Sequence, residues 1–150
     1  LGDVYKRQDL KAREKMAEAS IVAGVAFSHP RTTGSHACSF PLTNIYGLPH
    51  GEACAFTLDY FLKFNAEHAD GDGRITALAK DCGFNDAFEM ADEITAMKKR
   101  MGMRCKLSEI GCETDEQIDE LTKKSMSMLM TRNPITLTQK DIKEMYIKLK

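Results

Sequence analysis

Apolar residues recur along the chain at intervals of three and four, which is the spacing of one face of an α-helix. The pattern predicts helices over residues 9–27, 36–44, 51–65, 74–82 and 86–101, then one from 115 to the Asn133-Pro134 stop, and a last one after Thr138. The residues expected to face inward include Leu78, Ala79, Met97, Ile118, Leu121, Ser125, Met128, Ile142, Met145 and Tyr146. No convincing strand or internal repeat is found, so the sequence predicts one all-α domain.

Local signals mark several helix ends: Thr138 caps the last helix, and Gly83 fits the C-terminal cap of the helix over 74–82. Thr114 and Gln117 form a capping box, in which the threonine hydroxyl accepts the Gln117 amide hydrogen. Pro41 has no backbone N–H and must therefore lie in the first turn of its helix or kink it. Residues 28–35 have the composition of a loop. The stretch 51–65 is so apolar that we expect it to form one largely buried helix.

The composition is that of an ordinary globular protein and limits the partners. The 150 residues carry 21 Lys and Arg against 22 Asp and Glu, and 43% are hydrophobic. A net charge of −1 favours neither nucleic acid nor an anionic membrane surface. No secretory signal or membrane-spanning run is found. The five cysteines are odd in number and lack a C-x-x-C pair, which indicates reduced, mostly buried thiols in a cytoplasmic protein.

The ten glycines are scattered and form neither G-x-G-x-x-G nor a P-loop, so the chain shows no nucleotide-phosphate cradle. The first residue is Leu1 rather than Met, which indicates an incomplete reading frame. Residues 1–8 have no apolar period and are interpreted as a truncation or sequencing scar. The remaining residues, 9–150, are expected to form a helical metal-binding domain that is itself partial.

Two histidines are the candidate functional residues. His36 lies where a glycine-bearing loop enters a helix, and His50 lies fourteen residues later, directly after Pro49. A short helix and a turn between them can fold back and bring the two imidazoles together. Neutral imidazole is a good ligand for Fe(II) and Zn(II), so the pair is a candidate metal site. Glu52 could support His50 or simply be a first-turn helix carboxylate.

The segment around the histidines reads GSHACSFPLTNIYGLPHGEA and resembles the histidine signature of the iron-dependent alcohol dehydrogenases. Both histidines and the Pro49-His50-Gly51 triplet stand at the family's spacing. The upstream AGVAF and the closing NPITLTQKDI are similar to the family as well. The resemblance covers about residues 17–150, and it implies the helical C-terminal domain of the dehydroquinate synthase-like fold.

The resemblance implies an oxidoreductase that interconverts an alcohol and an aldehyde or ketone with NAD or NADP. Members hold one divalent metal, usually iron and sometimes zinc, with an aspartate and three histidines, and His36 and His50 match the last two ligands. The other two ligands and the nucleotide-binding domain are expected outside this chain, so the chain alone should be inactive. The metal polarises the substrate oxygen. The intact enzyme is expected to be a homo-oligomer.

Three residues are expected to line the substrate pocket, and no catalytic residue is assigned. Phe40 stands where many members carry a histidine, which suggests apolar contact with substrate or cofactor. Phe27 matches a pocket-lining position, with a core phenylalanine as the alternative. Arg31 lies in a segment similar to a subgroup linked to phosphonate metabolism, so it could hold an anionic aldehyde; the alternative is a surface arginine.

Two other interpretations stay open. A zinc glycerol dehydrogenase or a dehydroquinate synthase-like lyase shares the two-domain plan but differs in the signature around the histidines. A non-catalytic helical interaction module could retain the histidines as relics. Metal content separates the last possibility from the enzymes.

Overall fold

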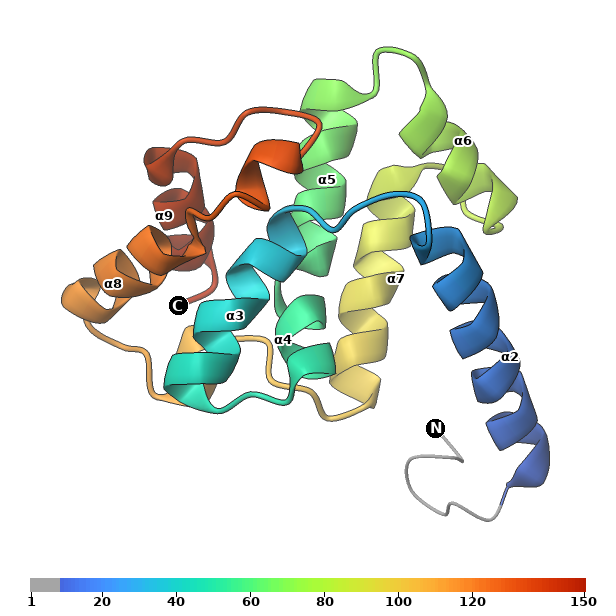
Figure 1. Ribbon diagram of the computed structural model, residues 1–150, viewed down its shortest axis with the longest axis horizontal. Helices are drawn as coiled ribbons and strands as arrows, with labels where there is room; N and C mark the ends of the chain where they lie inside the picture. Colours follow the sequence, from blue (N-terminus) through green and yellow to red (C-terminus); the bar gives the residue numbers. More distant parts are fainter. Residues whose placement is uncertain (1–8) are drawn as a thin grey trace. The chain divides into compact units, whose positions relative to one another are not determined.

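The computed structural model describes residues 9–150, and residues 1–8, interpreted above as a scar, lie outside the described residues. The chain divides after Arg31 into two compact units, which are taken separately below. Helices and no strand are present in the described residues, which confirms the all-α class (Figure 1). None of the helices between residues 9 and 150 has both the length and the apolar character needed to cross a membrane.

The first unit contains α2 (Leu10–Phe27), close to the predicted range. Asp9 caps its start, because the carboxylate accepts a hydrogen bond from the backbone N–H of Ala12 at 3.0 Å. Phe27 is the last residue of α2, and Arg31 lies in the connector that follows.

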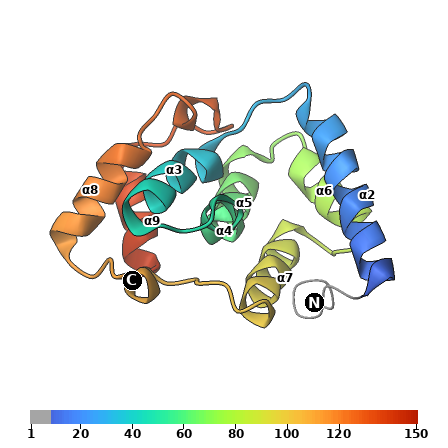
Figure 2. The same cartoon turned by 60° about the horizontal axis from the view of Figure 1, so that its bottom comes forward.

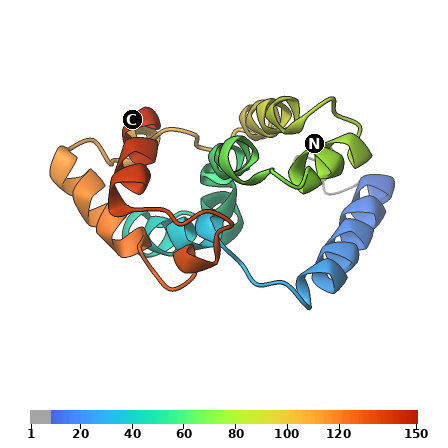
Figure 3. The same ribbon diagram turned by 90° about the horizontal axis from the view of Figure 1, so that it is seen from above.

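The second unit is a bundle of helices that runs from Thr32 to Lys150. Its elements are α3 (Gly34–Tyr46), α4 (His50–Phe56), α5 (Leu58–Ala69), α6 (Arg74–Asp81), α7 (Ala87–Arg100), the 3-10 helix η1 (Leu107–Ile110), α8 (Asp115–Ser125), the 3-10 helix η2 (Met130–Arg132) and α9 (Gln139–Lys148). Helix α3 packs against α4 and α8, α5 against α7, and α8 against α9. In Figures 2 and 3, α8 and α9 lie at one side of this unit, α6 and α7 at the other, and α4 and α5 between them.

The apolar core of this bundle includes buried residues of α3 and α4, the two helices that carry the histidines. Its buried members are Ala37, Cys38, Leu42, Leu48, Ala53, Phe56, Phe61, Leu107, Cys112, Ile118, Leu121, Met130, Leu137, Ile142, Met145 and Tyr146. The Tyr146 hydroxyl lies 2.8 Å from the Ser125 hydroxyl, so a polar contact inside the core is satisfied. Helices α3 and α4 are therefore anchored on their buried sides next to the candidate site.

The prediction of one helix over residues 51–65 was wrong, because the stretch is divided into α4 and α5 at Thr57. Thr57 has φ −111° and ψ 4° and is fully buried. The carbonyl of Phe56, the last residue of α4, accepts a hydrogen bond from Lys98 Nζ at 3.2 Å. A break of one residue hardly changes the phase of the apolar pattern along the sequence. The hydrogen-bond donor to the Phe56 carbonyl comes from α7, which is distant in the sequence. His50 is thus the first residue of a short helix of its own.

Helix α3 also differs from its predicted range of 36–44. It begins at Gly34, where a side chain would collide with the ring of Phe61, and it continues to Tyr46. Pro41 lies well inside the helix rather than in its first turn. Gly34 is required by close packing against Phe61 and not by a turn. The prediction from composition that the loop extends over residues 28–35 was therefore wrong at its end.

The later helix ends were predicted with mixed success. The capping boxes at Thr114 and Thr138 are both formed, and Gly83 has a positive φ of 89° as a C-terminal cap requires. Helix α8, however, ends at Ser125 instead of continuing to Asn133. Met128 is consequently 75% exposed and not inward.

Most of the other inward predictions were confirmed, and two were wrong. Those confirmed as buried are Ala79, Ile118, Leu121, Ser125, Ile142, Met145 and Tyr146. Leu78 and Met97 are exposed, and the residue after Met97, Lys98, is buried instead.

Candidate metal centre

His36 and His50 come together at the starts of two neighbouring helices. His36 is in the first turn of α3, and His50 opens α4 directly after Pro49. Between them, Gly47 adopts a left-handed φ of 68° that turns the chain back. The two imidazole centroids are 5.4 Å apart, with an angle of 71° between the rings. Two nitrogen ligands thus converge from two elements.

The surroundings of His36 favour its neutral form. Burial lowers the pKa of His36, and the nearby His50 lowers it further, because a second positive charge there is unfavourable. A neutral imidazole has the free nitrogen lone pair that a metal needs. The electrostatics of the pair therefore fit a cation site.

Cys54 is a third potential ligand, and sequence reasoning missed it. Its Sγ lies 3.5 Å from His50 Nε2 on the same face of α4. One ligand atom from each of His36, His50 and Cys54 lies within 4.8 Å of the others. The signal was available, because His50 and Cys54 are four residues apart and α4 is helical. The expectation of mostly buried thiols was wrong, since only Cys38 and Cys112 are buried.

Of the three expected pocket residues, only Phe40 lies in the same unit as the histidines. Phe40 is one turn after His36, its ring centroid is 6.0 Å from that of His50, and the side chain is 46% exposed. It also lines a shallow hollow of about 340 Å³ next to Pro41 and Lys124. Phe27 and Arg31 belong to the first unit.

Glu52 does not face a histidine, because its carboxylate is committed to Arg104. Oε1 accepts hydrogen bonds from the Arg104 backbone N–H and Nε at 2.9 and 2.8 Å, and Oε2 accepts one from Nη2 at 2.7 Å. The side-chain hydrogen bond from Arg104 lowers the pKa of Glu52. This bidentate pair fixes the start of α4, and with it the element that carries His50 and Cys54.

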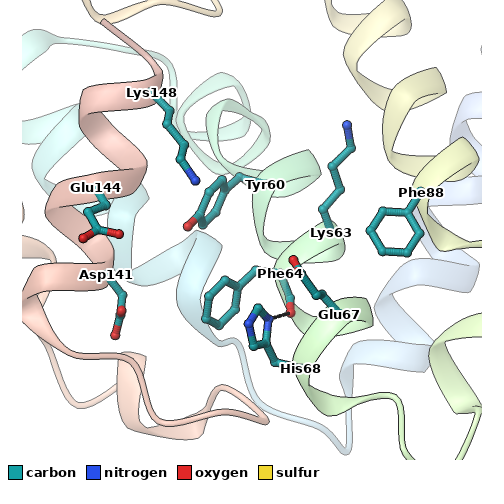
Figure 4. A pocket seen from close by; sticks show the side chains of 9 residues that line it. All are labelled: Tyr60, Lys63, Phe64, Glu67, His68, Phe88, Asp141, Glu144 and Lys148. Atoms are coloured by element: carbon teal, nitrogen blue, oxygen red, sulfur yellow. Dashed lines mark hydrogen bonds between the residues drawn. The ribbon is translucent and has the colours of Figure 1, made fainter.

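A second concavity, of about 510 Å³, lies between α5 and α9 and does not include the histidine pair (Figure 4). Its residues are Tyr60, Lys63, Phe64, Glu67, His68, Phe88, Asp141, Glu144 and Lys148. Many of its polar groups already have partners in the protein: His68 with the Phe64 carbonyl, Lys63 with Asp92, and Asp141 with Thr138. It offers few free groups that converge on a ligand.

Comparison with known proteins decides the family. The profile of the Fe-containing alcohol dehydrogenase family, C-terminal part, matches residues 2–149. The chain belongs to the iron-containing alcohol dehydrogenase family. The resemblance of the histidine segment is thereby confirmed, and the fold is the helical C-terminal domain of that family.

Three relatives match nearly the whole of this chain. An alcohol dehydrogenase of Thermococcus barophilus is 33% identical over 141 residues, which are 92% of this chain and 36% of that protein. A sulfoacetaldehyde reductase from Bifidobacterium kashiwanohense, solved in complex with NAD+, matches with a TM-score of 0.89 and 47% identity over 98% of this chain and 38% of its own. An iron-containing alcohol dehydrogenase from Thermococcus thioreducens matches with a TM-score of 0.80 and 29% identity over 95% and 38%.

The chain thus spans little more than a third of the length of these three relatives. The donor set near His36 fits a divalent transition metal, because imidazole nitrogen and thiolate sulfur are both good ligands for such ions.

Proposed function

We propose that this domain is the metal-holding part of an enzyme that interconverts an alcohol and an aldehyde or ketone with NAD or NADP. The observation that carries the proposal is the convergence of His36 and His50, with centroids 5.4 Å apart, inside a segment of the matched family. Relatives named as alcohol dehydrogenases favour this reaction over a lyase or a non-catalytic module.

In this proposal, His36 and His50 hold one divalent cation, iron or zinc. A cation there would polarise the substrate oxygen and stabilise an alkoxide as a Lewis acid. The lowered pKa of His36 keeps its imidazole available as a ligand. Phe40 lies beside His50, with the two ring centroids 6.0 Å apart, and would limit the access of water from that side of a bound cation. NAD or NADP and the remaining ligands would come from other parts of the enzyme.

The proposed substrate is a small aldehyde or alcohol with an anionic group. Arg31, in the first unit, is our candidate for bidentate binding of such a group. Phe27 and Phe40 are each a separate candidate for contact with the carbon chain of the substrate. Support comes from the sulfoacetaldehyde reductase at 47% identity, whose named substrate carries a sulfonate next to the aldehyde. The free thiols are consistent with a reducing compartment such as the cytoplasm, and we further propose a homo-oligomeric enzyme.

The test is the metal content of the intact enzyme. His36→Ala and His50→Ala are each expected to remove the bound metal and the NAD(P)-dependent activity together, because each deletes a ligand. Metal is measured by mass spectrometry of the purified protein. The control is His68→Ala, since His68 lies in the concavity of Figure 4. The 150-residue chain alone should show no turnover.

Full metal stoichiometry in either histidine variant would refute the ligand assignment. Loss of metal in His68→Ala as well would show that the effect is not specific to the pair. Robust turnover by the 150-residue chain would refute the proposal that other parts of the enzyme are needed.

A further inference from the structure

We propose that Glu52 and Arg104 are positioning residues of the metal centre, because their ion pair holds the turn of α4 from which His50 projects. Neither residue is a metal ligand. The inference rests on the proposed function, since it needs His50 to hold the cation. It adds that retention of the metal depends on Arg104, which lies 52 residues beyond Glu52.

His50 is exposed, so its position depends mainly on the backbone of α4. This helix has seven residues, which is about two turns, and a helix this short is not stable by itself in water. Ala53 and Phe56 are fully buried and hold one face of it. Both follow the first three residues of α4, so the start of the helix needs another contact.

Glu52 supplies that contact in the first turn. Its carboxylate accepts three hydrogen bonds of 2.7–2.9 Å from Arg104, two from the guanidinium and one from the backbone N–H. An exposed ion pair is usually weak, but a bidentate arginine–carboxylate pair is the exception. The side chain of Glu52 is also only 16% exposed, so solvent screens this pair less than a surface pair.

The segment that carries Arg104 is itself fixed. Glu109 Oε2 accepts hydrogen bonds from the two backbone N–H groups directly after Arg104, at 2.7 and 2.8 Å. Leu107, which opens η1, is fully buried, and its N–H donates to the Leu149 carbonyl at 2.7 Å. Arg104 therefore binds Glu52 from a part of the chain that is tied to the core.

The two ends of α4 are held by different residues of one segment. Lys98 Nζ donates to the Phe56 carbonyl at the end of α4, whereas Arg104 holds its beginning. Removal of the Arg104 contact should loosen the end that carries His50 and leave the other end in place. A loosely held ligand loses more conformational entropy when it binds a metal, so the affinity for the metal should fall.

The experiment measures Fe²⁺ binding to the intact enzyme, kept free of oxygen. Glu52→Ala removes all three hydrogen bonds, while Arg104→Met removes the two from the guanidinium and keeps the one from the backbone. Residues that support metal ligands are worth about 10–100-fold in affinity, so we expect Glu52→Ala to bind Fe²⁺ about tenfold more weakly. Bound Fe²⁺ should also be lost faster to an excess of a coloured chelator.

Arg104→Met should weaken Fe²⁺ binding in the same direction but less, because the backbone contact remains. The double variant should match Glu52→Ala, since both substitutions remove the same contact. Arg104→Lys keeps the charge but loses the fork of donors, so it should restore the affinity only in part. NAD(P)-dependent activity should fall at one equivalent of Fe²⁺ and recover toward that of the wild type in excess Fe²⁺.

Two controls separate positioning of His50 from a general loss of stability. Asp119→Asn breaks the ion pair with Lys143, which joins α8 to α9. Ile142→Val removes a methylene group from the core in α9. Both should keep the wild-type affinity for Fe²⁺. Circular dichroism checks that each protein is folded, and the two Arg104 variants carry the test if Glu52→Ala is not.

Wild-type affinity and release rate in the folded Glu52 and Arg104 variants would overturn the inference. An equal weakening in the two controls would overturn it as well. His36→Ala and His50→Ala distinguish this failure from failure of the proposed function. If they lose Fe²⁺ while the Glu52 and Arg104 variants bind it as the wild type does, only the inference fails. If the histidine variants bind Fe²⁺ as the wild type does, the proposed function fails and the inference fails with it.

Discussion

Lys98 is a charged side chain in the interior of the bundle, only 3% exposed. Its Nζ lies 2.7 Å from Asp59 Oδ1 and also donates to the Phe56 carbonyl. Asp59 accepts a further hydrogen bond from the Thr95 hydroxyl. The ammonium thus links the end of α4 and the start of α5 to α7, and it balances a carboxylate that is itself mostly buried.

We expect Lys98→Ala to lower the free energy of unfolding by about 3–5 kcal/mol, because it leaves the Asp59 carboxylate buried without its counter-ion. Urea denaturation measures the change. The control is Lys124→Ala, whose pair with Glu120 is half exposed on both sides and is worth about 0.5 kcal/mol or less. Equal losses in the two variants would show that Lys98 does not stabilise the fold through this buried pair.

The Glu52–Arg104 pair makes stability depend on pH. The hydrogen bond from Arg104 lowers the pKa of Glu52 below its usual value of 4.5, so the folded state binds the Glu52 proton less readily than the unfolded state. This contribution is complete above the usual pKa and is lost as the pH falls through the lowered value. In Glu52→Gln it should be absent throughout.

The measurement is the difference in unfolding free energy between wild type and Glu52→Gln, from about pH 7 down to about pH 3. The wild type should be the more stable protein at the upper end of this range, and the difference in unfolding free energy should shrink below the usual pKa of 4.5. A difference that stays constant or grows in acid would contradict the lowered pKa of Glu52. Glu120→Gln is the control, because Glu120 forms an exposed pair within one helix.

At the scale of elements, the start of α3 depends on a close contact. A Cβ at Gly34 would collide with the ring of Phe61 in α5. We expect Gly34→Ala to cost about 1–3 kcal/mol of unfolding free energy, because either the ring or the first turn of α3 must shift. His36 lies in that turn, so the metal content of the intact enzyme should fall as well.

The matched control for Gly34→Ala is Gly51→Ala. Gly51 also lies in a first helical turn, in α4, but a Cβ there meets nothing within 4 Å. This variant should be neutral or slightly stabilised, since alanine has the higher helix propensity. A neutral Gly34→Ala, measured by thermal or urea unfolding, would show that the contact with Phe61 is not tight.

An element could be predicted from the sequence where the interacting residues that form it are close together along the chain, and not where they are far apart. The caps at Thr114 and Thr138 were predicted because each depends on residues three positions apart. The break at Thr57 was not predicted, because Lys98, which binds the Phe56 carbonyl, is 42 residues away. Within the candidate site, His36 and His50 stood out through a family motif. Cys54 lay outside that motif, and only the helical register of α4 brings it beside His50.

At the scale of the whole chain, the residues of the apolar core all come from the second unit, from Ala37 to Tyr146. The three candidate ligands belong to this unit as well. Because burial of apolar surface is the main source of stability, the second unit should carry the cooperative unfolding of the chain.

We therefore expect a chain of residues 32–150 to unfold in a single transition, with a urea midpoint close to that of residues 1–150. Urea unfolding followed by circular dichroism is the measurement. Leu121→Ala is the control for sensitivity, since loss of this buried leucine should cost about 2–5 kcal/mol in either chain. If residues 32–150 are unfolded while residues 1–150 are not, the stability of the bundle depends on α2, and the division after Arg31 does not separate independent folding units.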